Sequence, residues 1–151
     1  LEFLTTELVP HVEKHFAAGG PGILVGQSNS GFFTLFAMIE APEAFDAFLA
    51  SSPMIGWDKD LIHQGTRSLF GGRNSYPEAL FMNMGDDDYD HVTGFLPDYA
   101  DLLKDLAPQD FRWINQVIEG GGHVPESTYR EGIRFILDPV DGTVAETPAS
   151  D

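Results

Sequence analysis

A serine in a short turn between two apolar runs is the residue of this sequence best placed for chemistry. Ser28 lies in the turn 26–31, Gly-Gln-Ser-Asn-Ser-Gly, which joins the apolar runs 23–25 and 32–39. When a strand turns sharply into a helix, the central residue takes a strained conformation and its side chain is exposed. Such a turn would also direct the Asn29 amide toward an oxyanion at the helix start. The alternative is an ordinary turn in which one of these side chains caps the helix.

A serine hydroxyl needs a base to remove its proton, and His123 is the histidine placed to do so. It follows three glycines, residues 120–122, after the predicted strand 111–118. We predict that this turn brings the imidazole over the strand ends; a solvated loop histidine is the alternative. The other histidines are predicted on an exposed helix face or in polar loops: His11, His15, His63 and His91.

The acid that orients such a base is expected in the acidic turn that follows the run 79–84. Open parallel sheets place ligands and reacting groups at the carboxyl ends of their strands. We predict that Asp88 is this acid, with Asp87 as the alternative. The remaining carboxylates of the turn are expected to be solvated or to cap a helix.

The same turn imitates the start of a calcium-binding loop, because Asp86, Asp88 and Asp90 alternate along it. A calcium loop then requires a glycine and, at its end, a bidentate glutamate. His91 and Pro97 stand at these two positions. We therefore reject an EF-hand and predict no metal site.

Hydrophobic periodicity predicts the elements that position these residues. Apolar residues recur every three or four positions from Leu1 to Phe16, as in an amphipathic helix. The run 23–25 is wholly apolar, which is typical of a central parallel strand covered on both faces. Strands that alternate with helices predict an α/β fold, a parallel sheet flanked by helices. The other predicted elements are strands at 45–50, 79–84 and 111–118, and helices at 32–39, 61–69, 95–106 and from near residue 125.

The chain order Ser28, Asp88, His123, each after a different strand, is the order found in α/β-hydrolases. The segment 23–53, which ends in Ala-Ser-Ser-Pro, resembles the group of α/β-hydrolases that contains esterase D-like enzymes and siderophore (enterobactin-type) esterases. Two further places are similar to the same group. One is Trp57-Asp58, and the other is the segment after His123, where the matching residues are Pro125, Tyr129, Gly132, Arg134 and Phe135. The resemblance covers most of residues 1–137.

This resemblance implies that Ser28 is a nucleophile, His123 its base and an acid near Asp88 the orienting carboxylate. The sequence departs from the group in three places. Ser30 replaces a common glycine, the acid of the group is often glutamate, and the segment between His123 and Tyr129 is shorter than usual.

We predict a serine-dependent ester hydrolase that needs neither a metal nor an organic cofactor. Gln27, Met54 and Trp57 are expected to contact the substrate, and Asn29 to supply an oxyanion-hole amide. Phe32 is a further candidate for the pocket, but a core position is the stronger expectation for it. Acyl transfer is a third reading, because it uses the same residues with an alcohol in place of water.

The strand before Ser28 lies mid-sheet in such folds, and the second oxyanion donor comes from an earlier loop. In this sequence only three later strands accompany the run 23–25, so one of its edges would be bare. We therefore expect the C-terminal part of a longer hydrolase, completed by an N-terminal half, or a chain completed by a partner or a second copy. The alternative function is a non-catalytic, hydrolase-like binding module.

Eight Lys and Arg against 24 Asp and Glu give a formal net charge of −16. Such a field repels phosphate backbones and anionic headgroups, so we expect neither nucleic acid nor a membrane as a partner. The predicted esterase chemistry implies a small-molecule ester as the partner instead. No apolar run could span a bilayer and no signal peptide is visible, so a soluble chain is expected. The absence of cysteine leaves the compartment open. We expect residues 1–138 to form one domain and residues 139–151 a disordered acidic tail.

Overall fold

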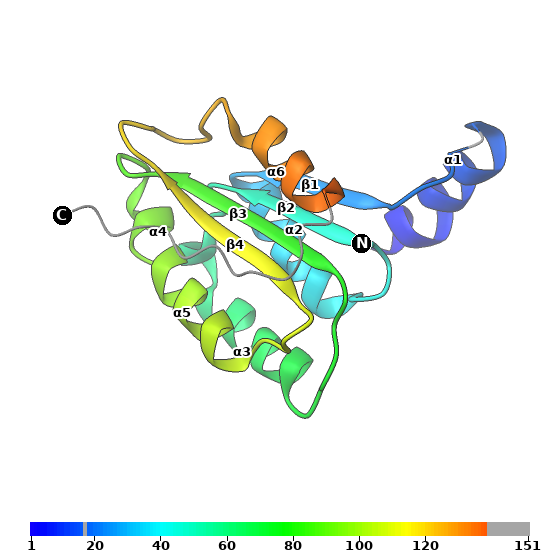
Figure 1. Ribbon diagram of the computed structural model, residues 1–151, viewed down its shortest axis with the longest axis horizontal. Helices are drawn as coiled ribbons and strands as arrows, with labels where there is room; N and C mark the ends of the chain where they lie inside the picture. Colours follow the sequence, from blue (N-terminus) through cyan, green and yellow to red (C-terminus); the bar gives the residue numbers. More distant parts are fainter. Residues whose placement is uncertain (17, 139–151) are drawn as a thin grey trace.

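The computed structural model describes residues 1–16 and 18–138 and contains a four-stranded parallel sheet (Figure 1). The strands lie side by side in chain order, and each pairs in parallel with the next. The four predicted strands are confirmed to within two residues at each end: β1 (Ile23–Gln27), β2 (Ala47–Ser51), β3 (Ala79–Gly85) and β4 (Arg112–Ile118). The disordered tail predicted for 139–151 lies outside the described residues.

Helices cover both faces of this sheet, as the alternating pattern predicts. The larger core lies between one face and α2 (Asn29–Glu40), α3 (Lys59–Phe70) and α5 (Leu96–Leu106). The smaller core lies on the other face, under α6 (Thr128–Leu137). Alternate residues of β2 serve the two cores, since Phe48 packs in the larger and Leu49 in the smaller. All four strands therefore end at one edge of the sheet, and the turns that follow them can meet there.

The expectation that residues 23–25 form a strand covered on both faces is wrong. Strand β1 is an edge strand of the described sheet, in line with the bare edge expected for it. One of its faces is also open, since the Val25 side chain is 38% exposed. The helix on that face, α6, contacts mainly β2 and β3. The apolar composition of a strand shows that its side chains are suited to burial. Whether both faces of the strand are buried also depends on which helices pack against them.

The helices after β2 and β3 are more extensive than the periodicity predicts. The stretch 54–77 contains a 3₁₀ turn, η2 (Ile55–Trp57), followed by α3, whose first turn is capped by the Asp58 carboxylate. A short helix, α4 (Asp90–Thr93), precedes α5. His63 lies on α3 and His91 on α4, so the expectation that both lie in loops is wrong.

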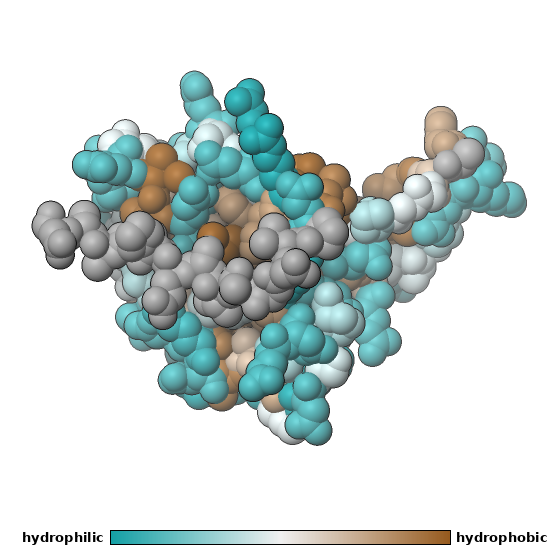
Figure 2. Space-filling model, viewed as in Figure 1, coloured by the Kyte–Doolittle hydropathy of each residue, from teal (hydrophilic) through white to brown (hydrophobic). Residues whose placement is uncertain are grey.

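The N-terminal helix is confirmed, with a change of helical type within it. The segment η1 (Leu4–Leu8) is a π-helix and α1 (Val9–Phe16) is α-helical. Pro10 gives a reason for the wider turn, because its ring clashes with the carbonyl one turn earlier and it has no amide hydrogen to donate. This helical arm projects at the right of Figure 1 and carries exposed apolar surface (Figure 2), to which Phe3, Leu8 and Phe16 contribute.

The close approach of β1 and α2 requires a glycine at position 26. A Cβ atom there would lie 2.0 Å from the Ser30 carbonyl oxygen and 2.5 Å from Thr34 Oγ1. We expect Gly26→Ala to lower the free energy of unfolding by about 3 kcal/mol, because backbone atoms cannot yield easily. Gly19→Ala is the matched control, since no atom lies within 4 Å of its added Cβ. Equal urea midpoints for the two variants would contradict the prediction.

No helix in the described part of the chain has the length and apolar character needed to cross a bilayer.

Candidate active site

The turn between β1 and α2 holds Ser28 in a strained backbone conformation, with φ 55° and ψ −119°. The Ser28 amide donates to the Ser51 carbonyl at 2.9 Å, which ties the turn to the end of β2. Ser30 Oγ donates to the Gln27 carbonyl at 2.8 Å and accepts from the Gln27 amide at 3.1 Å. Serine at position 30 therefore closes the turn with its own side chain, while the Ser28 side chain is left at the carboxyl edge of the sheet.

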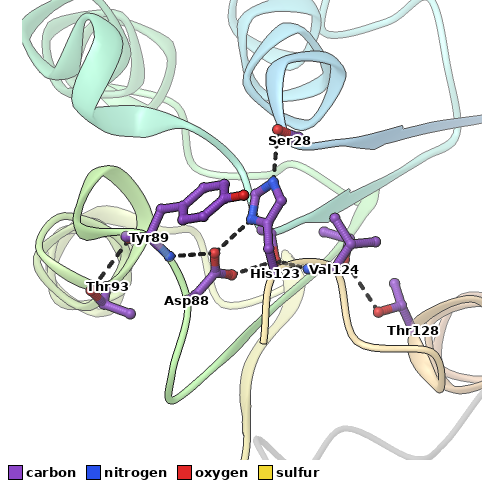
Figure 3. Close-up of polar contacts among 9 residues, drawn as sticks. Ser28, Asp88, Tyr89, Thr93, His123, Val124 and Thr128 are labelled. Atoms are coloured by element: carbon purple, nitrogen blue, oxygen red, sulfur yellow. Dashed lines mark hydrogen bonds and ion pairs between the residues drawn. The ribbon is translucent and has the colours of Figure 1, made fainter. Parts of the chain in front are cut away.

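Three side chains from three different turns form one hydrogen-bonded chain at this edge (Figure 3). The Ser28 Oγ atom lies 2.8 Å from His123 Nε2. The opposite nitrogen of the ring, His123 Nδ1, lies 2.6 Å from Asp88 Oδ1. With a proton on Nδ1, the imidazole donates to the carboxylate and Nε2 can accept from the serine hydroxyl. The structure thus brings together Ser28, His123 and Asp88.

The two candidate acids of the turn after β3 differ in burial and direction. The Asp88 side chain is fully buried, and its Oδ1 also accepts from the Tyr89 amide at 2.7 Å. The Asp87 side chain is exposed. It is the Asp87 backbone amide that makes a contact here, donating to the Gly121 carbonyl at 3.0 Å. The carboxylate in contact with His123 is therefore that of Asp88.

The glycines before His123 allow its loop to pack against the end of β3. A Cβ atom on Gly85 would lie 1.9 Å from the Gly121 carbonyl oxygen, so a side chain there would separate the two turns. Gly120 has a φ of 66°, a conformation that favours glycine. The glycines predicted to give a flexible turn thus permit a close contact between two backbones, which places the imidazole.

A shallow pocket beside the turn is lined by Asn29, Phe32 and Trp57. Asn29 is the first residue of α2, so its amide has no acceptor within the helix. Trp57 is 68% exposed. Phe32, for which a core position was the stronger expectation, lines the pocket and also packs partly against the larger core.

The other two predicted substrate contacts do not line this pocket. The Met54 side chain packs against the larger core, and its amide donates to the Ser28 carbonyl at 3.2 Å. The Gln27 backbone bonds with Ser30. The described residues include no group of three or more His, Asp or Glu side chains that could hold a metal ion.

Three residues around His123 are not among the site residues that the sequence predicts. The Tyr89 ring stacks on the imidazole, with ring centroids 4.4 Å apart and planes inclined by 29°. Ser52 is buried between the turns that carry Asp88 and His123. Val124 has a φ of 59°, a rare value for a β-branched residue. Of the three, only Ser52 has a signal in the sequence. It belongs to a Ser-Ser pair directly after an apolar strand, and a hydroxyl buried there needs a hydrogen-bond partner.

The parallel sheet, its flanking helices and the three converging turns define an α/β-hydrolase-type fold. The chain is similar to the BES protein from Bacillus cereus, with a TM-score of 0.77 and 24% identity over 89% of this chain and 53% of that chain. It is also similar to the IroE-like serine hydrolase from Shewanella oneidensis, with a TM-score of 0.75 and 22% identity over 88% of this chain and 45% of that chain. At sequence identities of 22–24%, this structural similarity establishes the fold of the chain and nothing more.

The chain belongs to the esterase family described as "Putative esterase", which matches residues 1–91. It is 26% identical to the ferri-bacillibactin esterase BesA of Bacillus subtilis, over 91% of this chain and 50% of that protein. It is 36% identical to the siderophore enterobactin esterase of Emericella nidulans, over 50% of this chain and 33% of that protein. The chain thus spans between a third and a half of the length of these relatives.

Proposed function

We propose that this chain carries the catalytic triad of a serine esterase, with Ser28 as nucleophile, His123 as general base and Asp88 as the orienting acid. The observation that carries the proposal is the unbroken contact from Ser28 Oγ through both ring nitrogens of His123 to Asp88 Oδ1. The positive φ of Ser28 supports it, because a nucleophile elbow holds its serine in this way. Membership of an esterase family supports the class of reaction.

In the proposed mechanism, Ser28 Oγ attacks the ester carbonyl while its proton passes to His123 Nε2. The Nδ1 proton stays on the ring, donated to Asp88, whose negative charge stabilises the imidazolium. Collapse of the tetrahedral intermediate expels the alcohol, which takes the proton from Nε2. Water then attacks the acyl-serine by the same route and releases the acid and free Ser28. An alcohol in the place of water would give acyl transfer.

The pocket residues have separate roles in this proposal. The Asn29 amide, at the start of α2, donates to the oxyanion. Phe32 and Trp57 offer an apolar surface for part of the ester. The two relatives are named for ferri-bacillibactin and enterobactin, so siderophore esters are the first natural substrates to test.

The first experiment is to label the chain with a fluorophosphonate and locate the adduct by peptide mass mapping. We expect one adduct, on Ser28, and at least a hundredfold slower labelling of the His123→Ala variant, because the hydroxyl then lacks its base. Absence of the adduct, or an adduct that forms equally without His123, would contradict the proposal and favour the binding module.

A further inference from the structure

Ser52 occupies the point where three turns of the site meet. It directly follows β2, its side chain is fully buried, and its amide donates to the Asn83 carbonyl on β3 at 2.8 Å. Its φ is 45°, a conformation that residues other than glycine rarely adopt. A polar side chain in such a position must be held by its hydrogen bonds.

The Ser52 hydroxyl links the acid of the site to the loop of its base. Oγ donates to Asp88 Oδ2 at 2.5 Å and accepts from the Val124 amide at 2.9 Å. A hydroxyl has one donor and two acceptor positions, so both bonds can exist together. The donor must point to Asp88, because an amide can only donate. One oxygen atom therefore ties the turn after β3 to the residue that follows His123.

The two oxygens of Asp88 have different partners. Oδ1 accepts from the Tyr89 amide and contacts His123 Nδ1. Within the described part of the chain, the bond to Oδ2 comes from Ser52 alone. Loss of that bond leaves a buried carboxylate oxygen without a donor, and the carboxylate free to rotate away from the imidazole.

The second residue that Ser52 holds is Val124, whose backbone is strained. A β-branched residue with φ 59° is strained, and strain persists only where neighbouring contacts hold it. The bond from the Val124 amide to Ser52 Oγ is such a contact. Because Val124 adjoins His123, relaxation of its backbone would move the imidazole.

We propose that Ser52 is a positioning residue, which fixes Asp88 and the His123 loop relative to Ser28 without touching the substrate. The inference rests on the proposed function, because it concerns how efficiently the same serine is activated. It predicts that removing one buried hydroxyl lowers the reactivity of a different serine.

The test compares Ser52→Ala with Ser51→Ala in the same chain. Ser51 is the adjacent serine, is equally buried, and shares its hydroxyl hydrogen bond with Thr128 Oγ1 at 3.2 Å, away from the triad. The readout is the second-order rate of fluorophosphonate labelling at Ser28. We expect Ser52→Ala to slow labelling about ten- to a hundredfold, and Ser51→Ala by less than about threefold.

A double-mutant comparison separates positioning from a general loss of stability. In the Asp88→Asn background the Ser52→Ala change should cost less than in the unmodified chain, because the part of its effect that passes through the Asp88 carboxylate is already lost, while the part that passes through Val124 remains. Equal labelling rates for the two serine variants, or an undiminished effect of Ser52→Ala in the Asp88→Asn background, would overturn the inference.

Two further samples distinguish failure of this inference from misfolding and from failure of the proposed function. Ser52→Gly removes the same hydroxyl and tolerates a φ of 45°, so it replaces Ser52→Ala if that variant does not fold. The unmodified chain reports on the proposed function itself. No labelling of Ser28 in that chain overturns both proposals, whereas rapid labelling that is indifferent to Ser52 overturns this inference alone.

Discussion

Replacement of Ser28 by alanine is expected to lower the rate of ester hydrolysis by a factor on the order of 10³ to 10⁶. Position 28 then has no oxygen to attack the carbonyl, and the hydrogen bond to His123 Nε2 is lost, so only the acceleration that the remaining groups of the site supply is left. The measurement is steady-state hydrolysis of p-nitrophenyl acetate. The fold should survive, because alanine has no larger a side chain than serine and the turn is held by backbone bonds and by Ser30.

Ser68→Ala is the control for this prediction. Ser68 is an exposed residue of α3, so its loss should leave both the rate and the melting temperature unchanged. A Ser28→Ala variant that keeps more than about a tenth of the rate would show that another group catalyses the reaction. A variant that loses its activity together with its melting transition would report unfolding instead.

Sequence reasoning located the parts of the site that topology determines. Parallel strands end at one edge of a sheet, so residues after three successive strands must lie near one another. For this reason the sequence order alone predicts the approach of Ser28, Asp88 and His123. The choice between Asp88 and Asp87 depends on one side-chain direction within a turn, which no periodicity reports.

The contacts around the imidazole could not be predicted from the sequence, for a different reason. Tyr89 stacks on His123, and Ser52 bonds to Asp88, only because two loops close onto the end of β3. The stacking of Tyr89 has no sequence pattern of its own, and the Ser-Ser pair indicates a buried hydroxyl at position 51 or 52 without naming its partner. The wrong expectation for β1 has the same origin, since the cover of an apolar strand is supplied by segments distant in the chain.

The fold explains why the approach of these turns is precise. Gly26 and Gly85 stand where two backbones come so close that a Cβ atom would overlap a carbonyl oxygen. The first contact sets the angle between β1 and α2, and hence the position of Ser28. The second sets the distance between the turns of Asp88 and His123. Two glycines far apart in the sequence therefore determine the geometry of one hydrogen-bonded chain.

Asp88→Asn is expected to lower the rate of p-nitrophenyl acetate hydrolysis at neutral pH by about 10³- to 10⁴-fold. An amide carries no charge to stabilise the imidazolium, and its NH₂ group can turn toward Nδ1 and favour the wrong tautomer. The folded state should persist, because asparagine has nearly the same shape as aspartate and retains an oxygen that can accept from Ser52.

Asp87→Asn is the matched control, because it makes the same chemical change one residue earlier in the same turn. The Asp87 side chain is exposed, and its contact with Gly121 uses the backbone amide, which the substitution keeps. Its rate should therefore stay within about twofold of the unmodified chain. The reverse pattern, a large loss for Asp87→Asn and a small one for Asp88→Asn, would transfer the role of the acid to Asp87. Similar small losses for both would mean that His123 acts without an orienting carboxylate.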